Sequence, residues 1–332
     1  MGITLEAILD RNGVIRLKEP LTLDGPKRVI VEILDDIPTV GDSLTTDSSS
    51  TETPQHAFVN TCRYRILREL GCGGMSQTYQ AEDTNSGALV CVKRLHSWTN
   101  QHSLMQECRA LAKLSHPYIV RLLDFDTMTK YPYLVMEYVE GTRLDAFVRQ
   151  AGALPEVVVV LVGLRVFKAI AYAHSQDIIH RDLKPSNIII AAPEEDLIPK
   201  VLDFGLAIVS RRDERNRITA VGNLAGTLHY MAPEQLEGAE LSSACDVYAV
   251  GQMLWEILVG KPAFAGSSYC ELIDEKRSFE GGLQLDGQNS WSKSLSKLVS
   301  DCTLRDPQQR PTAAEAAEIL HDHSLRAGDD TA

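Results

Sequence analysis

The sequence has little of what marks a disulfide-stabilised, zinc-binding or nucleic-acid-binding protein. Its seven cysteines are odd in number, scattered along 332 residues and never spaced as C-x-x-C, so neither a disulfide framework nor a zinc site is indicated. Basic residues are outnumbered, with 33 Lys and Arg against 45 Asp and Glu and a net charge of -12. This balance argues against a general nucleic-acid or anionic-membrane binder. We therefore expect no nucleic-acid and no membrane partner, and a reducing, cytoplasmic location.

Long hydrophobic runs are also scarce. The most apolar run, residues 157–164, is too short to span a bilayer and is followed by Arg165 and Lys168. Residues 1–6 have no basic region followed by an apolar run, and Glu6 stands where myristoylation needs Ser or Thr. The apolar fraction of 44% is ordinary for globular chains. We expect a soluble protein with room for more than one domain.

The N-terminal residues predict a small β unit, which we assign to residues 1–38. Residues 3–10 and 14–17 flank an Asn-Gly turn signal, and residues 28–34 are rich in β-branched residues. Three strands in under ~40 residues seldom fold alone. The pattern resembles the short β domains of bacterial antitoxins, some of which form swapped-hairpin dimers. That resemblance implies a homodimer through this unit; a sheet that only decorates the main domain stays an open alternative.

Residues 39–60 form the expected linker. Its central part, residues 41–55, is Ser, Thr and Asp with almost nothing apolar. Such a segment cannot offset the entropy of ordering.

The stretch that organises the chain is residues 178–187, IIHRDLKPSN, followed after a short apolar strand by Asp-Phe-Gly at 203–205. Its carboxylates, amide and lysine suit phosphoryl transfer, in which catalysis consists mostly of positioning and charge neutralisation. Asp182 has the chemistry to orient a hydroxyl and take its proton. Asn187 and Asp203 offer hard oxygens for Mg²⁺.

These residues resemble the catalytic loop and metal-binding segment of the protein kinase family, and the Asp-Leu-Lys-Pro order is similar to its serine/threonine branch. The resemblance implies an α+β, two-lobe protein kinase fold over residues 61–322, preceded by the small N-terminal β unit. Its small β-rich lobe would take residues 61–137, its larger helical lobe residues 138–322, and residues 323–332 would be a disordered tail. Lys184 would neutralise charge on the transferred γ-phosphoryl of ATP. His180 would pack under the loop.

The resemblance also implies a nucleotide site upstream of this stretch. Lys93 would contact phosphates and pair with Glu107 from a helix. Main-chain groups of Glu137 and Val139 would bind adenine, beside Met136. The glycine-rich loop completes the ATP-binding set with Gly71, Cys72, Gly73 and Gly74. Two positions depart from the family pattern: Ser76 replaces the third glycine, and Thr78 stands where a valine usually covers the base.

Further positions match the architecture of the family's large lobe. Asp246 would accept hydrogen bonds from the catalytic-loop backbone, and Arg310 would form a buried ion pair with Glu234. Residues 226–234 resemble the substrate-docking region, and the resemblance places Thr227 against the catalytic Asp and Lys. Thr219 is then the candidate for a regulatory phosphate.

Two functions compete on the sequence. The first is a bacterial, eukaryotic-like serine/threonine protein kinase that uses ATP and Mg²⁺, acts on protein hydroxyls and phosphorylates itself. The alternative is a pseudokinase or scaffold that binds ATP as a switch and a partner through the N-terminal β unit. Ser76 and Thr78 are its support, but a pseudokinase more often loses Lys93, Asp182 or Asp203.

Overall fold

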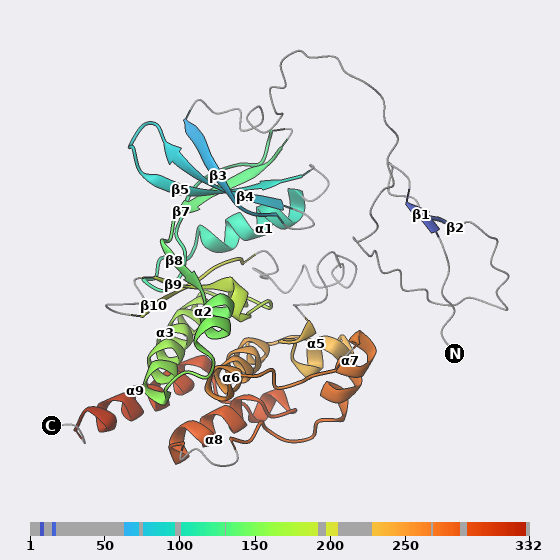
Figure 1. Cartoon of the computed structure of the whole chain (residues 1–332), viewed down its shortest axis with the longest axis vertical. Coiled ribbons are helices and arrows are strands. Elements are labelled where there is room, and N and C mark those ends of the chain that lie inside the picture. Colours follow the sequence, from blue (N-terminus) through green and yellow to red (C-terminus); the bar gives the residue numbers. More distant parts are fainter. Residues whose placement is uncertain are drawn as a thin grey trace. The chain divides into compact units, whose positions relative to one another are not determined.

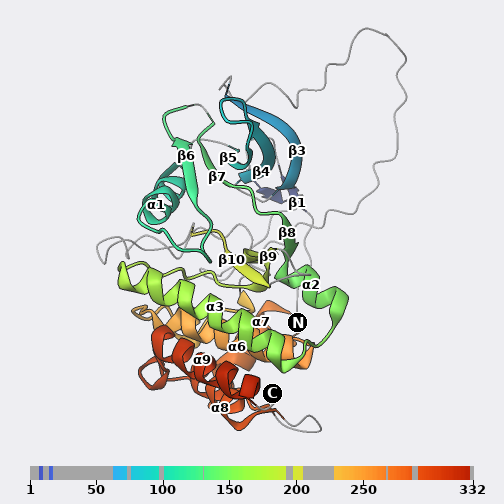
Figure 2. The same ribbon diagram turned by 90° about the vertical axis from the view of Figure 1, so that its left-hand side faces the viewer.

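The computed structural model divides into two compact units, Met1–Glu52 and Thr53–Ala332, each described by itself (Figures 1 and 2). The structure describes residues 7–9, 15–17, 63–72, 76–96, 101–129, 131–191, 197–204, 228–266, 268–285 and 291–329.

The first unit contains the predicted hairpin. β1 (Ala7–Leu9) pairs antiparallel with β2 (Ile15–Leu17). The third predicted strand, residues 28–34, and the predicted linker lie outside the described residues.

The small lobe of the second unit is a five-stranded antiparallel sheet with one helix alongside it (Figure 1). The strand order is β3-β4-β5-β7-β6. The elements are β3 (Tyr64–Cys72), β4 (Ser76–Asp83), β5 (Leu89–Leu95), α1 (Gln101–Leu111), β6 (Leu122–Asp126) and β7 (Tyr133–Glu137).

The alternation of side chains along β5 decides to which face of the sheet Lys93 points. Val90 and Val92 are buried in a cluster that includes Tyr64 and Tyr133. Because successive side chains of a strand point to opposite faces, Lys93 lies on the other face of the sheet.

The large lobe is mainly helical, with a small sheet of order β10-β9-β8 (Figure 2). Its strands are β8 (Gly141–Arg143), β9 (Ile188–Ala191) and β10 (Ile198–Val201). Its helices are α2 (Leu144–Ala151), α3 (Glu156–Ser175), α5 (Pro233–Glu237), α6 (Ala244–Val259), α7 (Tyr269–Ser278), α8 (Lys293–Cys302) and α9 (Ala313–Asp329). Two short 3-10 turns complete it, η3 (Pro185–Asn187) and η5 (Pro307–Gln309).

Helix α3 is the central support of this lobe. It begins after Pro155, a residue typical of the first turn of a helix, and packs against α6, α9 and β10. Its length of 20 residues and mean hydropathy of 1.8 are enough to cross a membrane. The apolar run 157–164 is therefore one part of a longer apolar helix, which the alanines after Lys168 continue. Its ten buried residues are those of a core helix.

Short connections at the small sheet carry the candidate chemistry. The stretch 178–187 joins α3 to β9, and residues 202–204 follow β10. One boundary differs from expectation: α9 continues to Asp329, whereas a disordered tail was predicted from residue 323. The helix continues because His323 packs against Glu156, with Nε2 and Oε1 2.9 Å apart, and helix-forming residues follow.

Candidate active site

Lys93 and Glu107 form an ion pair that joins β5 to α1. Both carboxylate oxygens of Glu107 accept hydrogen bonds from Lys93 Nζ at 2.9 Å, which confirms the predicted pair. The Glu107 side chain is only 3% exposed. Burial favours the neutral amine, but the carboxylates of Asp203 and Glu107 raise the pKa of Lys93. Lys93 is therefore a cation at neutral pH.

Asp203 is the second carboxylate on the same amine. It forms an ion pair with Lys93 Nζ, and its own side chain is 43% exposed. Its φ of 63° lies in the left-handed region, which Asp adopts more readily than most residues. Burial opposes ionisation, but the Lys93 ammonium lowers the pKa of Asp203 to about 2. Asp203 is therefore a charged carboxylate that stays open to solvent.

Asp182 lies in the large lobe with Lys184 and Asn187 around it. Lys184 Nζ donates to Asp182 Oδ2 at 2.8 Å and to Oδ1 at 3.1 Å. Asn187 Nδ2 donates to the Asp182 carbonyl at 2.8 Å and to Oδ2 at 3.2 Å. The turn η3 produces this cluster by folding residues 185–187 back onto the loop. The carboxylate that the sequence proposes as a base is thus held from two sides.

The residues proposed for Mg²⁺ are brought together by the backbone. Leu202 N–H donates to the Asn187 carbonyl at 2.8 Å, which places Asp203 beside the catalytic loop. Since the Asn187 amide nitrogen is engaged on Asp182, its amide oxygen is the end available to a cation. In the part of the chain described, no cluster of three or more His, Cys, Asp or Glu side chains could hold a metal. Two oxygen ligands completed by phosphates and water fit Mg²⁺, which normally keeps several waters.

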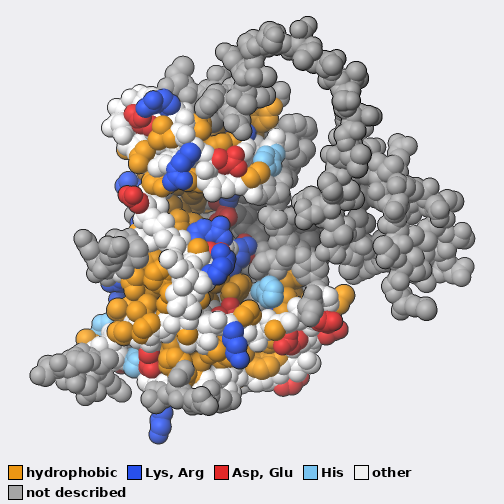
Figure 3. Space-filling model, viewed as in Figure 1, with side chains coloured by type: hydrophobic (Ala, Val, Ile, Leu, Met, Phe, Trp, Pro, Cys, Tyr) orange, Lys and Arg blue, Asp and Glu red, His pale blue; other side chains and the backbone are white. Residues whose placement is uncertain are grey.

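Basic side chains gather where the two lobes meet (Figure 3). Lys93 in the small lobe and Lys184 in the large lobe are each less than one-fifth exposed. Partly buried cations are screened less than surface ones, so they suit an anionic group such as a phosphate.

Asp246, on α6, supports the catalytic loop from below. Its Oδ2 accepts a hydrogen bond from the backbone N–H of His180 and its Oδ1 from that of Arg181, both at 2.8 Å. The prediction for Asp246 is confirmed. Sequence reasoning missed His174, whose Nε2 lies 2.9 Å from the same carboxylate. Burial opposes ionisation, but the hydrogen bond from His174 lowers the pKa of Asp246. A histidine in the last turn of the helix before the loop was the available signal.

These bonds hold a strained backbone. Arg181 has a φ of 69°, in the left-handed region that costs a non-glycine residue roughly 1–2 kcal/mol. Two hydrogen bonds to one buried carboxylate maintain this conformation immediately before Asp182. The strain is therefore supported at the position where the loop turns its carboxylate outward.

His180 is a structural residue, as predicted. It is fully buried, and its ring centroid lies 4.5 Å from that of Phe204. Its Nε2 is 2.8 Å from the Leu202 carbonyl, and a carbonyl only accepts, so this nitrogen carries the proton. Its Nδ1 accepts from the Asp182 N–H at 3.3 Å. Both ring nitrogens are thus used internally, which leaves Asp182 as the base.

The connection between the lobes is anchored through Glu137. Its Oε1 accepts from Lys200 Nζ at 2.7 Å and from the Arg121 N–H at 3.1 Å. Met136, beside it, is buried, and Val139 packs partly against the core. The Glu137 N–H donates to the Arg121 carbonyl at 2.9 Å. Binding of adenine by the main chain of Glu137 and Val139 stays a prediction, with the Glu137 N–H already used.

The glycine-rich loop is described in part. Gly71 and Cys72 end β3, whereas Gly73 and Gly74 lie outside the described residues. A Cβ at Gly71 would meet no atom within 4 Å, so the space beside this glycine is open. That openness fits close approach of a phosphate to the backbone.

The two departures from the family pattern leave the sheet intact. Ser76 begins β4, and Thr78 lies directly opposite Lys93 in an unbroken antiparallel register. Threonine keeps the branched shape of valine at this place. The loop substitutions therefore do not displace the lysine.

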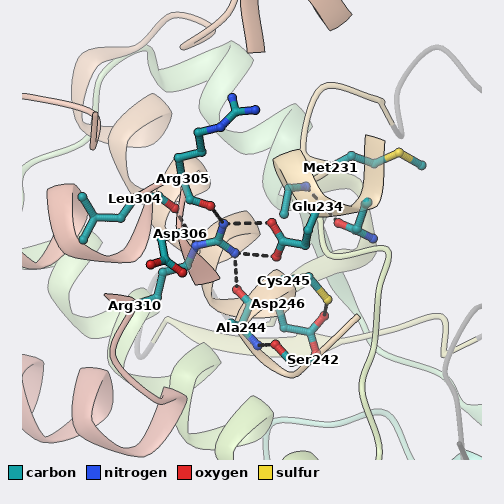
Figure 4. Close-up of polar contacts among 12 residues, drawn as sticks. Met231, Glu234, Ser242, Ala244, Cys245, Asp246, Leu304, Arg305, Asp306 and Arg310 are labelled. Atoms are coloured by element: carbon teal, nitrogen blue, oxygen red, sulfur yellow. Dashed lines mark hydrogen bonds and ion pairs between the residues drawn. The ribbon is translucent and has the colours of Figure 1, made fainter. Parts of the chain in front are cut away.

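Glu234 and Arg310 form the predicted buried ion pair (Figure 4). Arg310 Nη1 lies 2.6 Å from Glu234 Oε1, and Nη2 lies 2.9 Å from Oε2. The guanidinium also donates to the carbonyls of Leu304, Ala244 and Arg305. The pair ties α5 and α6 to the segment before α9. Thr219, Thr227 and Gly205 lie outside the described residues, and so does most of the segment that contains them.

Comparisons with known proteins agree with this geometry. Residues 64–322 match the family described as "Protein kinase domain". The probable serine/threonine-protein kinase PknB of Lactococcus lactis is 36% identical over 261 residues, which cover 76% of this chain and 40% of PknB. The serine/threonine-protein kinase PrkC of Bacillus subtilis is 33% identical over 261 residues, covering 77% of this chain and 39% of PrkC. The serine/threonine-protein kinase pkn2 of Myxococcus xanthus is 34% identical over 270 residues, with coverages of 78% and 32%. The chain thus matches well under half the length of these relatives.

Proposed function

The chain belongs to the protein kinase family, and from that premise we propose that it transfers the γ-phosphoryl group of ATP to a serine or threonine hydroxyl of a protein. The predicted fold class, two lobes with a β-rich small lobe and a helical large lobe, is confirmed by family and structure together. The relatives with the names of serine/threonine kinases are bacterial, which supports the bacterial, eukaryotic-like type.

One observation carries the proposal. Asp182, Lys184 and Asn187 form one hydrogen-bonded cluster. The Leu202-to-Asn187 backbone bond joins that cluster to Asp203, which contacts Lys93. A base, its lysine, two oxygen ligands and a phosphate-binding cation are therefore linked through contacts of this chain. Phosphoryl transfer requires this combination, because positioning and electrostatics supply most of the catalysis.

The step follows from these contacts. The acceptor hydroxyl hydrogen-bonds to Asp182, whose carboxylate takes the proton as the new oxygen–phosphorus bond forms. The bond between the γ-phosphorus and the β–γ bridging oxygen breaks, and ADP leaves with that electron pair. Lys184, held on Asp182, neutralises charge on the transferred group, and Lys93 binds the phosphates that stay behind.

Mg²⁺, when bound, would offset the negative charge of the phosphates. Asn187 and Asp203 are the residues that would hold it. The Asp203 carboxylate is ionised at neutral pH, which suits this role.

The pseudokinase alternative depends on Ser76 and Thr78. Both occupy regular positions in β4, and Lys93, Asp182 and Asp203 are all present. Nothing among the described residues favours that alternative.

Transfer of radiolabelled phosphate from ATP to a generic basic protein in the presence of Mg²⁺ tests the proposal. Wild type should transfer label, whereas Asp182→Asn and Lys93→Met should lose nearly all of it. Lys297→Met and Asp301→Asn are matched controls. They make the same two kinds of substitution in an ion pair on α8, outside the cluster. Wild type that transfers no more label than the two site variants would overturn the enzyme function.

Some expectations stand as further proposals. We propose a cytoplasmic protein that phosphorylates itself, carries a regulatory phosphate on Thr219 and dimerises through residues 1–38. Phosphopeptide mapping of an active preparation tests the phosphate. The same number of chains per particle in solution with and without residues 1–40 would contradict the dimer.

A further inference from the structure

Lys276 on α7 is buried in a way that surface helices rarely show. It is fully buried, and its Nζ donates to the Met231 carbonyl at 2.8 Å and to Gln252 Oε1 at 2.9 Å. The rings of Phe264 and Tyr248 lie 4.8 and 5.1 Å from Nζ. A buried ammonium needs such partners, because its desolvation is unfavourable. Its hydrogen-bond partners in the described structure are both neutral.

Gln252, on α6, is the junction of a larger network. Its Nε2 donates to the His229 carbonyl at 2.7 Å and to Glu256 Oε1 at 3.0 Å. These bonds fix the amide so that its oxygen faces Lys276. Tyr230 Oη donates to the other Glu256 oxygen at 2.5 Å. Lys276, Gln252 and Glu256 thereby hold three consecutive residues, 229–231.

This held segment lies beside the catalytic loop. Gln235 Nε2 donates to the Arg181 carbonyl at 3.1 Å, and Gln235 Oε1 accepts from the Ala232 N–H at 2.9 Å. One end of the segment is therefore fixed to the residue before Asp182. Its side chains at 229–231 are partly exposed. A polypeptide whose hydroxyl lies at Asp182 must pass along this neighbouring surface.

We propose that Lys276 is a positioning residue for the protein acceptor. It holds the Met231 carbonyl directly and the His229 carbonyl through Gln252, and thereby the surface that orients the acceptor chain toward Asp182. This proposal rests on the proposed kinase function. Lys276 touches neither the acceptor nor the Lys93 cluster, so its effect should separate acceptor binding from ATP binding.

Lys276→Met tests this role, because methionine keeps the length and loses both hydrogen bonds. Methionine leaves the Met231 carbonyl and Gln252 Oε1 without this donor, so some loss of stability is expected although the length of the side chain is kept. The KM for the protein acceptor should rise roughly tenfold, the order of effect expected when buried hydrogen bonds are lost. The KM for ATP should stay within about twofold of wild type. Lys297→Met is the matched control, with a side chain 75% exposed.

Hydrogen exchange of peptides covering residues 228–236 supplies a readout that needs no phosphoryl transfer. Faster exchange in Lys276→Met, with wild-type exchange in Lys297→Met, supports the positioning role even if the chain proves inactive as a kinase. Unchanged exchange, or an equal rise in both KM values, overturns it. If Lys276→Met does not fold, Gln252→Met replaces it under the same criteria, because it removes the link to His229.

Discussion

The two ion pairs predicted from the sequence differ in how completely the protein surrounds them. Arg310 has a fully buried side chain and donates to three carbonyls besides Glu234. Lys93 is 14% exposed, and its second partner, Asp203, is 43% exposed. The hydrogen-bonding groups of Arg310 are thus satisfied inside the fold, whereas the Asp203 carboxylate beside Lys93 remains open to solvent.

Their charges differ as well. Arg310 and Glu234 balance, one cation against one anion. The Lys93 ammonium faces two carboxyl groups, Glu107 and Asp203, and burial raises the pKa of Glu107 to about 7. The balanced, buried pair of Arg310 and Glu234 has a structural role. An open carboxylate such as that of Asp203 is suited to hold a further cation, and Mg²⁺ would supply positive charge for the phosphates there. The comparison predicts that one region governs stability and the other governs rate.

Asp182→Asn should give the largest effect on the rate side. Phosphoryl transfer should fall by roughly 10²–10⁴, because the carboxylate that accepts the proton is gone. The melting temperature should change little, since Asn retains the shape of the side chain. Steady-state transfer and thermal unfolding on one preparation measure both. A loss of stability in parallel with the rate would break the separation between the two regions.

Arg310→Met should give the largest effect on the stability side. The free energy of unfolding should fall by about 3–5 kcal/mol, because Glu234 is left as an unpaired buried charge. Urea denaturation measures the change. Arg305→Met is the control: Arg305 pairs with Glu237, whose side chain is 43% exposed, and exposed pairs contribute about 0–1 kcal/mol. Equal losses in the two variants would contradict the assignment.

The sequence predicted the contacts that depend on motif spacing. Lys93 with Glu107, Asp246 with the loop backbone, and Arg310 with Glu234 all lie as predicted. Each pair is separated by tens of residues or lies on different elements, so composition alone could not have joined them. The family resemblance supplied the pairing, and the structure supplied the geometry.

The contacts that the sequence did not predict involve ordinary residue types with no spacing signal. Lys276 sits in a charged helix segment, DEKRS, that reads as a solvated surface. Its burial depends on how α7 packs on α6, which is a tertiary property. Gln252 likewise becomes informative only when its partner, the His229 carbonyl, is known.

Asp246→Asn tests the connection between the two regions. Asparagine has one acceptor oxygen where Asp246 uses both, so the N–H of His180 or Arg181 loses its partner. The free energy of unfolding should fall by about 1–3 kcal/mol. The transfer rate should fall too, because the left-handed backbone at Arg181 loses support. If only the free energy of unfolding or only the transfer rate changed, Asp246 would not connect the two regions.

A dependence of stability on pH should come from Lys276. Burial lowers its pKa from 10.5 to about 7, against the opposing charges of Glu256, Glu275 and Glu234. Between these values the unfolded chain binds a proton that the folded chain does not, so stability rises with pH. The slope is at most about 1.4 kcal/mol per pH unit.

Urea denaturation at several values between about pH 7 and pH 9 measures that slope. Lys276→Met should be flatter than wild type across this window, whereas Lys297→Met should follow wild type. Parallel curves for wild type and Lys276→Met would mean that the amine stays charged when buried. In that event its two hydrogen bonds to the Met231 carbonyl and Gln252 stabilise the ammonium fully, and Lys276 would belong with Arg310 as a charge satisfied by the fold.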